Sequence, residues 1–570
     1  MKRWADRLIV AGLAAFGLAA IVGTVRHFGG IVALGGAAPA AGGAAAAGAG
    51  FWLIWRMSRL PARFVVPAAM LIAFGLRAVW IATVPTAPVS DFRTMAEAAR
   101  AVAGGDVGPL RSEYFQLWTY QVPFVLGEAA LFRLFGPDLA VLKWANAVVL
   151  ALLPAVGYAL GRSAAGGGRS FGAGQTRRAG GAPAGPPADG TAEAGAPEPG
   201  SRDGGVDAPE VGRTDPGPRH GAVGAAAAGG TDPGLRHSAV GAAGAGATEA
   251  EPRDGAAEAE AAETAGKLAA LLLAVYPSTV MMASVLTNQH LAALLAYGGL
   301  FVWGRALRRL SGGKGGRALM LTGAAGALLA AGDLVRPIGI VFVSAAVTGA
   351  LLFAGERPRL SGKEGRARFG FFGRLGLALG LVAVFFAGRT AVSVVLVTTG
   401  VTDRPLGNHE PLWKFVAGLN RETIGHFSRA DYEAVMGLPA GEARSAFERA
   451  LIAERLRAPG LGAFFMEKAA YLWGFPDQAP IWSGWAPPKP VLAAALAFER
   501  VLFLLAALGL AAFGRLRRPE IGPKAAVLAL FLLGYAAAHL VIEIQVRYRY
   551  DALPALLALG AVGWTKRRRK

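Results

Sequence analysis

The strongest constraint on this chain is a series of long apolar runs separated by short clusters of Lys and Arg. Each run is long enough to cross the hydrocarbon core of a bilayer, which takes about 17 to 25 residues in a helix. Only helices and closed barrels satisfy their backbone hydrogen bonds in lipid, and these runs are too continuous for barrel strands. The sequence therefore predicts an all-α polytopic membrane protein with about 11 to 13 spans.

The composition agrees with this class of protein. Of the 570 residues, 54% are hydrophobic and only 17% are charged, whereas a soluble domain carries roughly a quarter charged residues. The net charge of +20 does not indicate nucleic-acid binding, because the cations lie between apolar runs in the positive-inside pattern. Cysteine is absent, which excludes disulfides, a thiol nucleophile and Cys-based metal sites.

Counting the spans in order from the basic N-terminus places every large basic cluster on one side, interpreted as the cytoplasm. The first apolar stretch also resembles a signal peptide, but a second stretch follows directly without a convincing cleavage site, so we interpret it as a retained anchor. Both termini are then cytoplasmic, and the protein is expected in the cell membrane. The spans are expected near 8–24, 31–55, 64–84, 139–160, 267–286, 290–304, 373–396, 491–513, 523–542 and 550–565, with a short hairpin between 317 and 357.

The same count divides the chain into segments. They are an N-terminal transmembrane hairpin (1–63), a membrane segment with the first outer loop (64–161), a cytoplasmic insertion (162–266), central transmembrane helices (267–397), an external soluble loop (398–490) and C-terminal transmembrane helices (491–570). The insertion is rich in Gly, Ala, Pro and charged residues, and such a segment cannot bury enough apolar surface to fold, so we predict that it is disordered. Residues 121–136 are apolar but short, which favours a helix in the membrane interface.

Under this topology, the unusual polar residues near the membrane ends all lie on the external face. They are Asp91, Asn288, Gln289, Asp333, Arg336, Glu543, Arg547 and Arg549. Ionisable groups near the membrane are functional candidates. An active site is therefore expected outside.

Asp91 opens a segment whose apolar residues Phe92, Met95, Ala99 and Val102 recur at helical spacing, which predicts an amphipathic helix on the membrane surface. One interpretation is that Asp91, or Ser90 before it, is only the N-cap of this helix. The other is that the Asp91 carboxylate is a general base, which removes the proton from an acceptor hydroxyl as it attacks a sugar.

Arg336 and Arg547 also allow two interpretations. Each guanidinium could simply reach lipid phosphates from a helix end. Alternatively, the two converge externally and bind a phosphate or diphosphate, which Arg grips with two parallel hydrogen bonds. A base beside an anion site suits transfer from a lipid phosphate, because phosphate leaves as an anion that needs charge stabilisation.

An ordered set of motifs adds to this interpretation. They are SDF (90–92), PFVLGEAALFRLFG (123–136), YP and TNQH (276–290), GDLVRP (332–337), GLNRETIGHFSRAD (418–431) and QVRYRYDALP (545–554). The set resembles the membrane-embedded glycosyltransferases of the GT-C superfamily, in particular the family 39 group related to protein O-mannosyltransferases and aminoarabinose transferases.

The resemblance implies a GT-C type helix bundle with interface helices in the first outer loop and Asp91 as the catalytic acidic residue. It also implies a polyprenyl-phosphate sugar donor, with a protein, lipid or wall-polymer acceptor. Some relatives carry a second acidic residue close after the first one, or at the turn occupied here by Asn288 and Gln289. This chain lacks both, so no metal ligand is assigned, and a divalent cation stays open as a cofactor.

The sequence thus predicts an inverting glycosyltransferase. Asp91 is the base, Arg336 and Arg547 hold the donor phosphate, and residues 398–490 cover the site, whose pocket is shaped by Asn288, Gln289, Glu543 and Tyr548. The main alternative is a transporter or lipid flippase, which should show inverted repeats and charges near the bilayer midplane. A relative that has lost catalysis and only binds a lipid-linked sugar is the third hypothesis.

Overall fold

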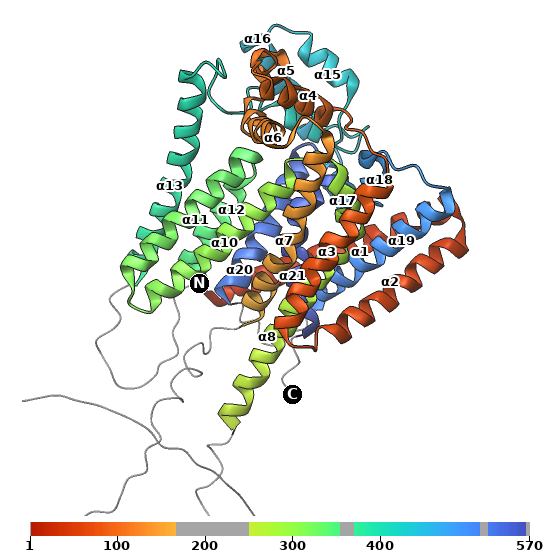
Figure 1. Cartoon of the computed structure of the whole chain (residues 1–570), viewed down its shortest axis with the longest axis vertical. Coiled ribbons are helices and arrows are strands. Elements are labelled where there is room, and N and C mark those ends of the chain that lie inside the picture. Colours follow the sequence, from red (N-terminus) through yellow and green to blue (C-terminus); the bar gives the residue numbers. More distant parts are fainter. Residues whose placement is uncertain (1, 167–249, 354–369, 513–521, 566–570) are drawn as a thin grey trace, which may run out of the picture. The chain divides into compact units, whose positions relative to one another are not determined.

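The computed structural model describes residues 2–166, 250–353, 370–512 and 522–565. Within these ranges all regular structure is helical and no strand occurs (Figure 1). The described ranges belong to one compact unit, Met1–Arg169 with Pro252–Lys570, apart from Ala250 and Glu251 at the edge of a second unit. The all-α prediction is therefore confirmed. Most of the expected insertion, residues 167–249, lies outside the described residues.

Nine helices in the described part of the chain are long and apolar enough to cross a membrane. They are α1 (Lys2–Gly35), α2 (Ala37–Met57), α3 (Ala62–Thr83), α7 (Leu139–Ala165), α10 (Gln289–Ser311), α11 (Gly315–Val335), α13 (Phe371–Thr398), α19 (Lys489–Ala512) and α20 (Pro523–Val541). A bent pair, α8 (Ala250–Val275) with α9 (Pro277–Met281) and η3 (Met282–Ser284), raises the number to ten if it forms one span. The chain is thus polytopic, and its described residues contain fewer full spans than the 11 to 13 expected.

Two further helices are shorter than a full span in the described residues, and each ends at the last described residue of its range. The helices α12 (Gly339–Phe353) and α21 (Arg549–Thr565) contain 15 and 17 residues, whereas a full span takes about 20. Both lie in segments for which the sequence predicts membrane crossings. Neighbouring helices of the bundle cover α21, and most of its residues are buried.

Local breaks in the helices follow from single residues. The first helix continues to Gly35, beyond the expected start of the second span, and ends where Gly36 adopts a φ of 97° that is open mainly to glycine. Pro277 occupies the first turn of α9, where proline is tolerated, and the chain bends there by 51°. At its other end α8 starts at Ala250, inside the segment predicted to be disordered, because residues 256–265 are rich in the strong helix formers Ala and Glu.

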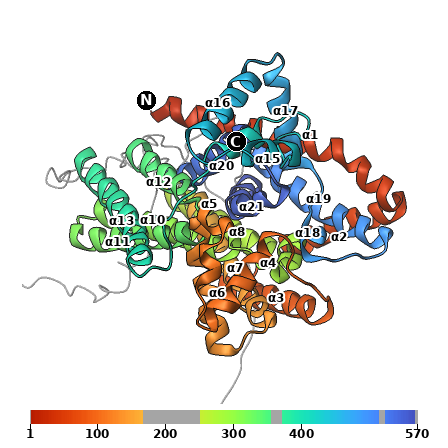
Figure 2. The same cartoon turned by 90° about the horizontal axis from the view of Figure 1, so that it is seen from above.

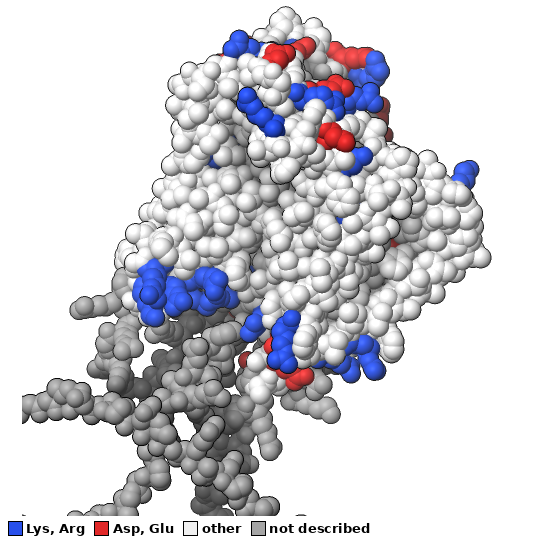
Figure 3. Space-filling model, in the orientation of Figure 1, with Lys and Arg blue, Asp and Glu red and all other residues white. Residues whose placement is uncertain are grey.

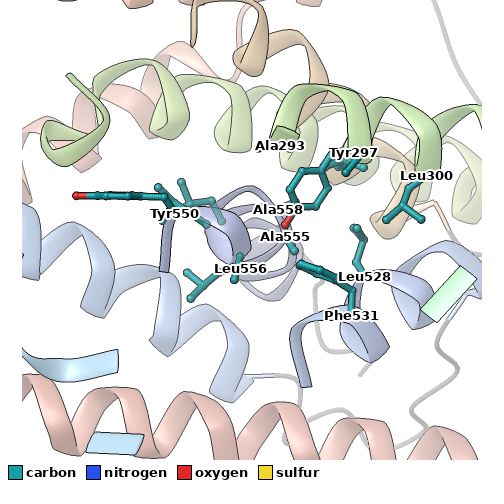
Figure 4. Close-up of a cluster of buried hydrophobic side chains, with 14 of the residues drawn as sticks. Ala293, Tyr297, Leu300, Leu528, Phe531, Tyr550, Ala555, Leu556 and Ala558 are labelled. Atoms are coloured by element: carbon teal, nitrogen blue, oxygen red, sulfur yellow. The ribbon is translucent and has the colours of Figure 1, made fainter. Parts of the chain in front are cut away.

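The centre of the bundle is α21, which packs against α7, α10, α19 and α20. Figure 4 shows Tyr297 and Leu300 of α10, with Leu528 and Phe531 of α20, around the alanines of α21. Small residues let α19 and α21 approach closely: a Cβ added to Gly563 would lie 1.8 Å from the carbonyl oxygen of Gly509. Such crossings are typical of membrane helices, whose association depends on close packing.

Short helices gather at one end of the bundle. They are α4 (Asp91–Ala103), η1 (Gly108–Arg111), α5 (Glu113–Leu117), η2 (Thr119–Gln121) and α6 (Val122–Phe135), with α14 (Trp413–Gly418), α15 (Arg429–Met436), α16 (Glu442–Arg457), α17 (Leu461–Gly474) and α18 (Ala479–Ser483). Figures 1 and 2 show the helices of the first loop and of the long loop on the same end. Because α6 coincides with residues 121–136, the predicted interface helix exists as a helix.

The opposite end carries the short basic turns between α2 and α3 and between α10 and α11 (Figure 1). On the face drawn in Figure 3, this lower end shows mainly Lys and Arg, whereas the upper end mixes both charges. The mainly basic surface and the surface of mixed charge thus lie at opposite ends of the bundle. That the basic end faces the cytoplasm stays a prediction from the positive-inside pattern.

Candidate functional site

The candidate site residues come from separate parts of the chain and lie at the end that carries the short helices. Asp91 begins α4, Asn288 and Gln289 lie at the start of α10, Arg336 follows α11, and Glu543, Arg547 and Tyr548 lie between α20 and α21, in part within η5 (Val546–Tyr548). Contacts between their side chains form two linked groups. One surrounds Asp551, and the other surrounds Arg547.

Asp551 is fully buried and is the centre of the first group. Its Oδ2 accepts hydrogen bonds from Arg336 Nε and from Tyr535 Oη, both at 2.9 Å, and its Oδ1 accepts one from Gln289 Nε2 at 3.3 Å. The hydroxyl of Tyr297 donates to the Asp551 carbonyl oxygen at 2.7 Å. This network neutralises Arg336 and ties α10, α11, α20 and α21 together.

Asn288 extends this group towards the first loop. Its Oδ1 accepts a hydrogen bond from Arg336 Nη1 at 3.2 Å, while its Nδ2 donates to Gln121 Oε1 at 3.1 Å. The Arg336 guanidinium also lies over the ring of Tyr548, 5.3 Å from its centroid. Asn288 therefore fixes the position of Arg336 through this hydrogen bond.

The long loop contributes directly to the second group. The amide of Glu543 donates to the Lys414 carbonyl oxygen at 2.7 Å, and the amide of Ile544 donates to that of Gly425 at 2.8 Å. Gly418 permits this approach, since a Cβ there would meet the backbone of Ile542 at 2.2 Å. The pairing of the two backbones brings the Lys414 ammonium into an ion pair with the Glu543 carboxylate.

The charge of Glu543 is secured by its neighbours. Burial alone would raise the pKa of this carboxyl, but the Lys414 ammonium, a hydrogen bond from Gln545 and the nearby Arg547 together hold the pKa below its ordinary value. Gln545 Nε2 donates to Glu543 Oε1 at 3.0 Å. Glu543 is therefore an ionised carboxylate, already engaged with one cation.

Arg547 is the centre of the second group and is only 9% exposed. Its guanidinium carbon lies 4.3 Å from the ring centroid of Trp482 and 4.7 Å from that of Phe92. Its Nε donates to Gln545 Oε1 at 2.5 Å. In the described part of the chain, Arg547 forms no ion pair, and neither Nη atom donates a hydrogen bond.

Asp91 is half-buried and directly precedes Phe92, whose ring contacts this guanidinium. Ser90 occupies the N-cap position of α4 at φ 51° and ψ −135°, and no side chain caps the helix there. Ser90 thus holds the N-cap position, as one interpretation expects, but its side chain makes no capping hydrogen bond. Its backbone conformation costs a non-glycine residue about 1–3 kcal/mol. The Asp91 carboxylate interacts electrostatically with Arg547. Burial raises the pKa of Tyr114, and the charge of Asp91 raises it further. It forms no ion pair with any described residue.

Several residues of the site receive no individual role from the sequence, although Gln545 and Asp551 lie within the motif QVRYRYDALP. They are Gln121, Lys414, Trp482, Tyr535, Gln545 and Asp551. An aspartate in an otherwise apolar helix is a detectable signal for Asp551, whereas Lys414 and Trp482 lie in a loop without periodicity. In the residues that the structure describes, no group of three or more His, Asp or Glu side chains is arranged to hold a metal ion.

Comparisons of the chain with protein-family models, with curated proteins and with solved structures give no match.

Proposed function

We propose that the chain is a glycosyltransferase of the GT-C type. It moves a sugar from a polyprenyl-phosphate-linked donor to an acceptor hydroxyl at the external face of the membrane. One observation carries the proposal. Of the four charged residues that the sequence assigns to the site, Arg336 and Glu543 form ion pairs with Asp551 and Lys414, which leaves one base and one cation, Asp91 and Arg547.

These two groups match the two needs of the reaction. The acceptor hydroxyl must lose its proton as its oxygen bonds to the anomeric carbon, and an unpaired carboxylate accepts that proton. The bond between the anomeric carbon and the phosphate oxygen breaks at the same time, and the phosphate leaves as an anion. A buried guanidinium stabilises this anion strongly, because its charge acts in a site of low dielectric constant.

Attack by the acceptor on the face opposite the phosphate inverts the anomeric configuration in a single step. Asp91 needs no covalent bond to the sugar in this scheme. The backbone of Ser90, directly before Asp91 at the start of α4, is strained, and strain of this kind clusters at functional sites.

The contacts divide the roles of the cations more finely than the sequence does. Asp551 already cancels most of the charge of Arg336, so we assign the donor phosphate to Arg547 and a supporting field to Arg336. Asn288 and Gln289 position Arg336 and Asp551, and Tyr548 lies between the two guanidiniums. The donor would arrive from the lipid, and the acceptor would be a protein, a lipid or a wall polymer.

The test is mass spectrometry of the glycolipid, glycoprotein and wall-polymer fractions from cells with the wild-type chain, with Asp91→Asn, with Asp106→Asn, or with none. Asp106 is the matched control because it is an exposed carboxylate in the same loop. We expect one sugar modification to be lost without the chain and with Asp91→Asn, and to be retained with Asp106→Asn. If Asp91→Asn preserves every modification at normal protein levels, the transferase proposal is wrong and transport becomes the better hypothesis.

A further inference from the structure

Arg336 and Arg547 each donate a hydrogen bond from Nε, but the acceptors differ in charge. Arg336 donates its Nε to the carboxylate of Asp551 at 2.9 Å, and Arg547 donates its Nε to the amide oxygen of Gln545 at 2.5 Å. A carboxylate both orients an arginine and cancels its charge. An amide oxygen only orients it, because Gln carries no charge.

The hydrogen bonds fix which way the Gln545 amide points. An ionised carboxylate only accepts hydrogen bonds and a guanidinium only donates them. Gln545 lies between the two, so its Nε2 must face Glu543 and its Oε1 must face Arg547, as observed. Lys414 engages the other oxygen of Glu543 and fixes the far end of this chain of contacts.

We propose that Gln545 is a positioning residue that aims the Nη atoms of Arg547 at a lipid-borne phosphate and leaves the guanidinium charge uncancelled. Stacking of Arg547 on Trp482 and Phe92 excludes water from its faces, so the edge that carries the Nη atoms is the direction left for an anion. This inference rests on the proposed function and adds to it the residue that keeps the phosphate site cationic.

The test uses the purified full-length protein in a neutral detergent, with farnesyl phosphate as the probe and farnesol as its uncharged match. Binding is measured by isothermal titration for the wild type, Gln545→Glu and Gln545→Met. Gln545→Glu keeps the shape and places a carboxylate on Arg547, and it also replaces the hydrogen bond to Glu543 by repulsion between two carboxylates. Gln545→Met removes the acceptor and adds no charge.

We expect Gln545→Glu to weaken farnesyl phosphate binding by roughly tenfold or more, because a charge-assisted pair now competes for Arg547. Gln545→Met should retain a clear preference for phosphate over alcohol, with a smaller loss of affinity. Farnesol binding should be equal in the wild type and both variants. Equal binding also shows that the variants are folded. Arg547→Gln should lose the phosphate preference to the same extent as Gln545→Glu and is the substitute if Gln545→Glu is not stable.

Two results would overturn the inference. One is a phosphate preference in Gln545→Glu equal to that of the wild type. The other is effective competition by inorganic phosphate at the probe's own concentration, which would assign the site to a free anion. Failure of the proposed function looks different: sugar modification would survive Asp91→Asn while farnesyl phosphate binding still depended on residue 545.

Discussion

Arg336 and Asp551 form an ion pair, 2.9 Å between Nε and Oδ2, although they are 215 residues apart in the sequence. The carboxylate side chain is fully buried and the guanidinium side chain is 18% exposed. Such a pair contributes little net stability over apolar residues of the same volume, but removing one partner leaves a buried charge without compensation. The pair therefore makes the site sensitive to change at either residue.

We expect Asp551→Ala to lower the free energy of unfolding by about 3–5 kcal/mol, since Arg336 loses its counter-charge and Tyr535 and Gln289 lose their acceptor. The midpoint of thermal unfolding of the full-length protein in detergent measures this. Glu433→Ala is the control, because its ion pair with Arg429 is exposed and should contribute at most about 1 kcal/mol. Equal shifts for the two variants would contradict the role given to Asp551.

Ser90→Gly should stabilise the protein, by about 1 kcal/mol, because glycine adopts a φ of 51° without the strain that serine bears. Ser112→Gly is the matched control: Ser112 also occupies an N-cap without a side-chain bond, but at an ordinary φ of −63°. It should be neutral or destabilising. Thermal unfolding of both variants decides between these expectations, and the rate of sugar transfer should fall only in Ser90→Gly, where Asp91 is held less firmly.

Gly563→Ala should destabilise the crossing of α19 and α21 by about 2 kcal/mol, because its Cβ would lie 1.8 Å from the carbonyl oxygen of Gly509 and the backbones must separate. Gly323→Ala in α11 has nothing within 4 Å of the added atom and should raise helix stability by up to about 1 kcal/mol. Opposite shifts in the unfolding midpoint are the expected result. A harmless Gly563→Ala would contradict the close approach of the two helices.

A carboxyl in the long loop predicts a pH dependence of stability. Burial, and then the neighbouring Glu410, raises the pKa of Glu448 to about 7, against the opposing effect of Arg444 and Arg449. The folded state then holds a proton that the unfolded state has released, so this contribution is complete below the ordinary pKa of 4.5 and is lost as the pH rises through 7. We expect a higher unfolding midpoint at about pH 5 than at about pH 8.

The variant Glu448→Gln should reduce this difference, because its amide stays neutral over the whole range. Glu433→Gln, at an exposed position in the same loop, should leave the difference unchanged. A pH profile that is identical in the wild type and Glu448→Gln would contradict the assignment.

Much of the fold is predictable from apolar length, as the agreement at α3, α7 and α20 illustrates. A helix boundary that depends on one backbone angle is not predictable in this way, since the sequence is apolar on both sides of the break at Gly36. The gathering of Asp91 and Arg547 at one end follows from counting spans. The positions of Lys414 and Trp482 cannot be predicted in this way, because these residues reach the site through tertiary contacts of a loop that has no periodic pattern.

The distance in sequence between Arg336 and Asp551 also sets an order of events during synthesis. At about 5–20 residues per second, a ribosome needs roughly 10 to 40 seconds to reach the aspartate after it has made the arginine. Throughout that interval the guanidinium has no counter-charge from its eventual partner, which favours keeping this end of the nascent bundle in water. The site closes only when the helix that carries Asp551 enters the bundle, so a chain interrupted before that residue is left without a complete site.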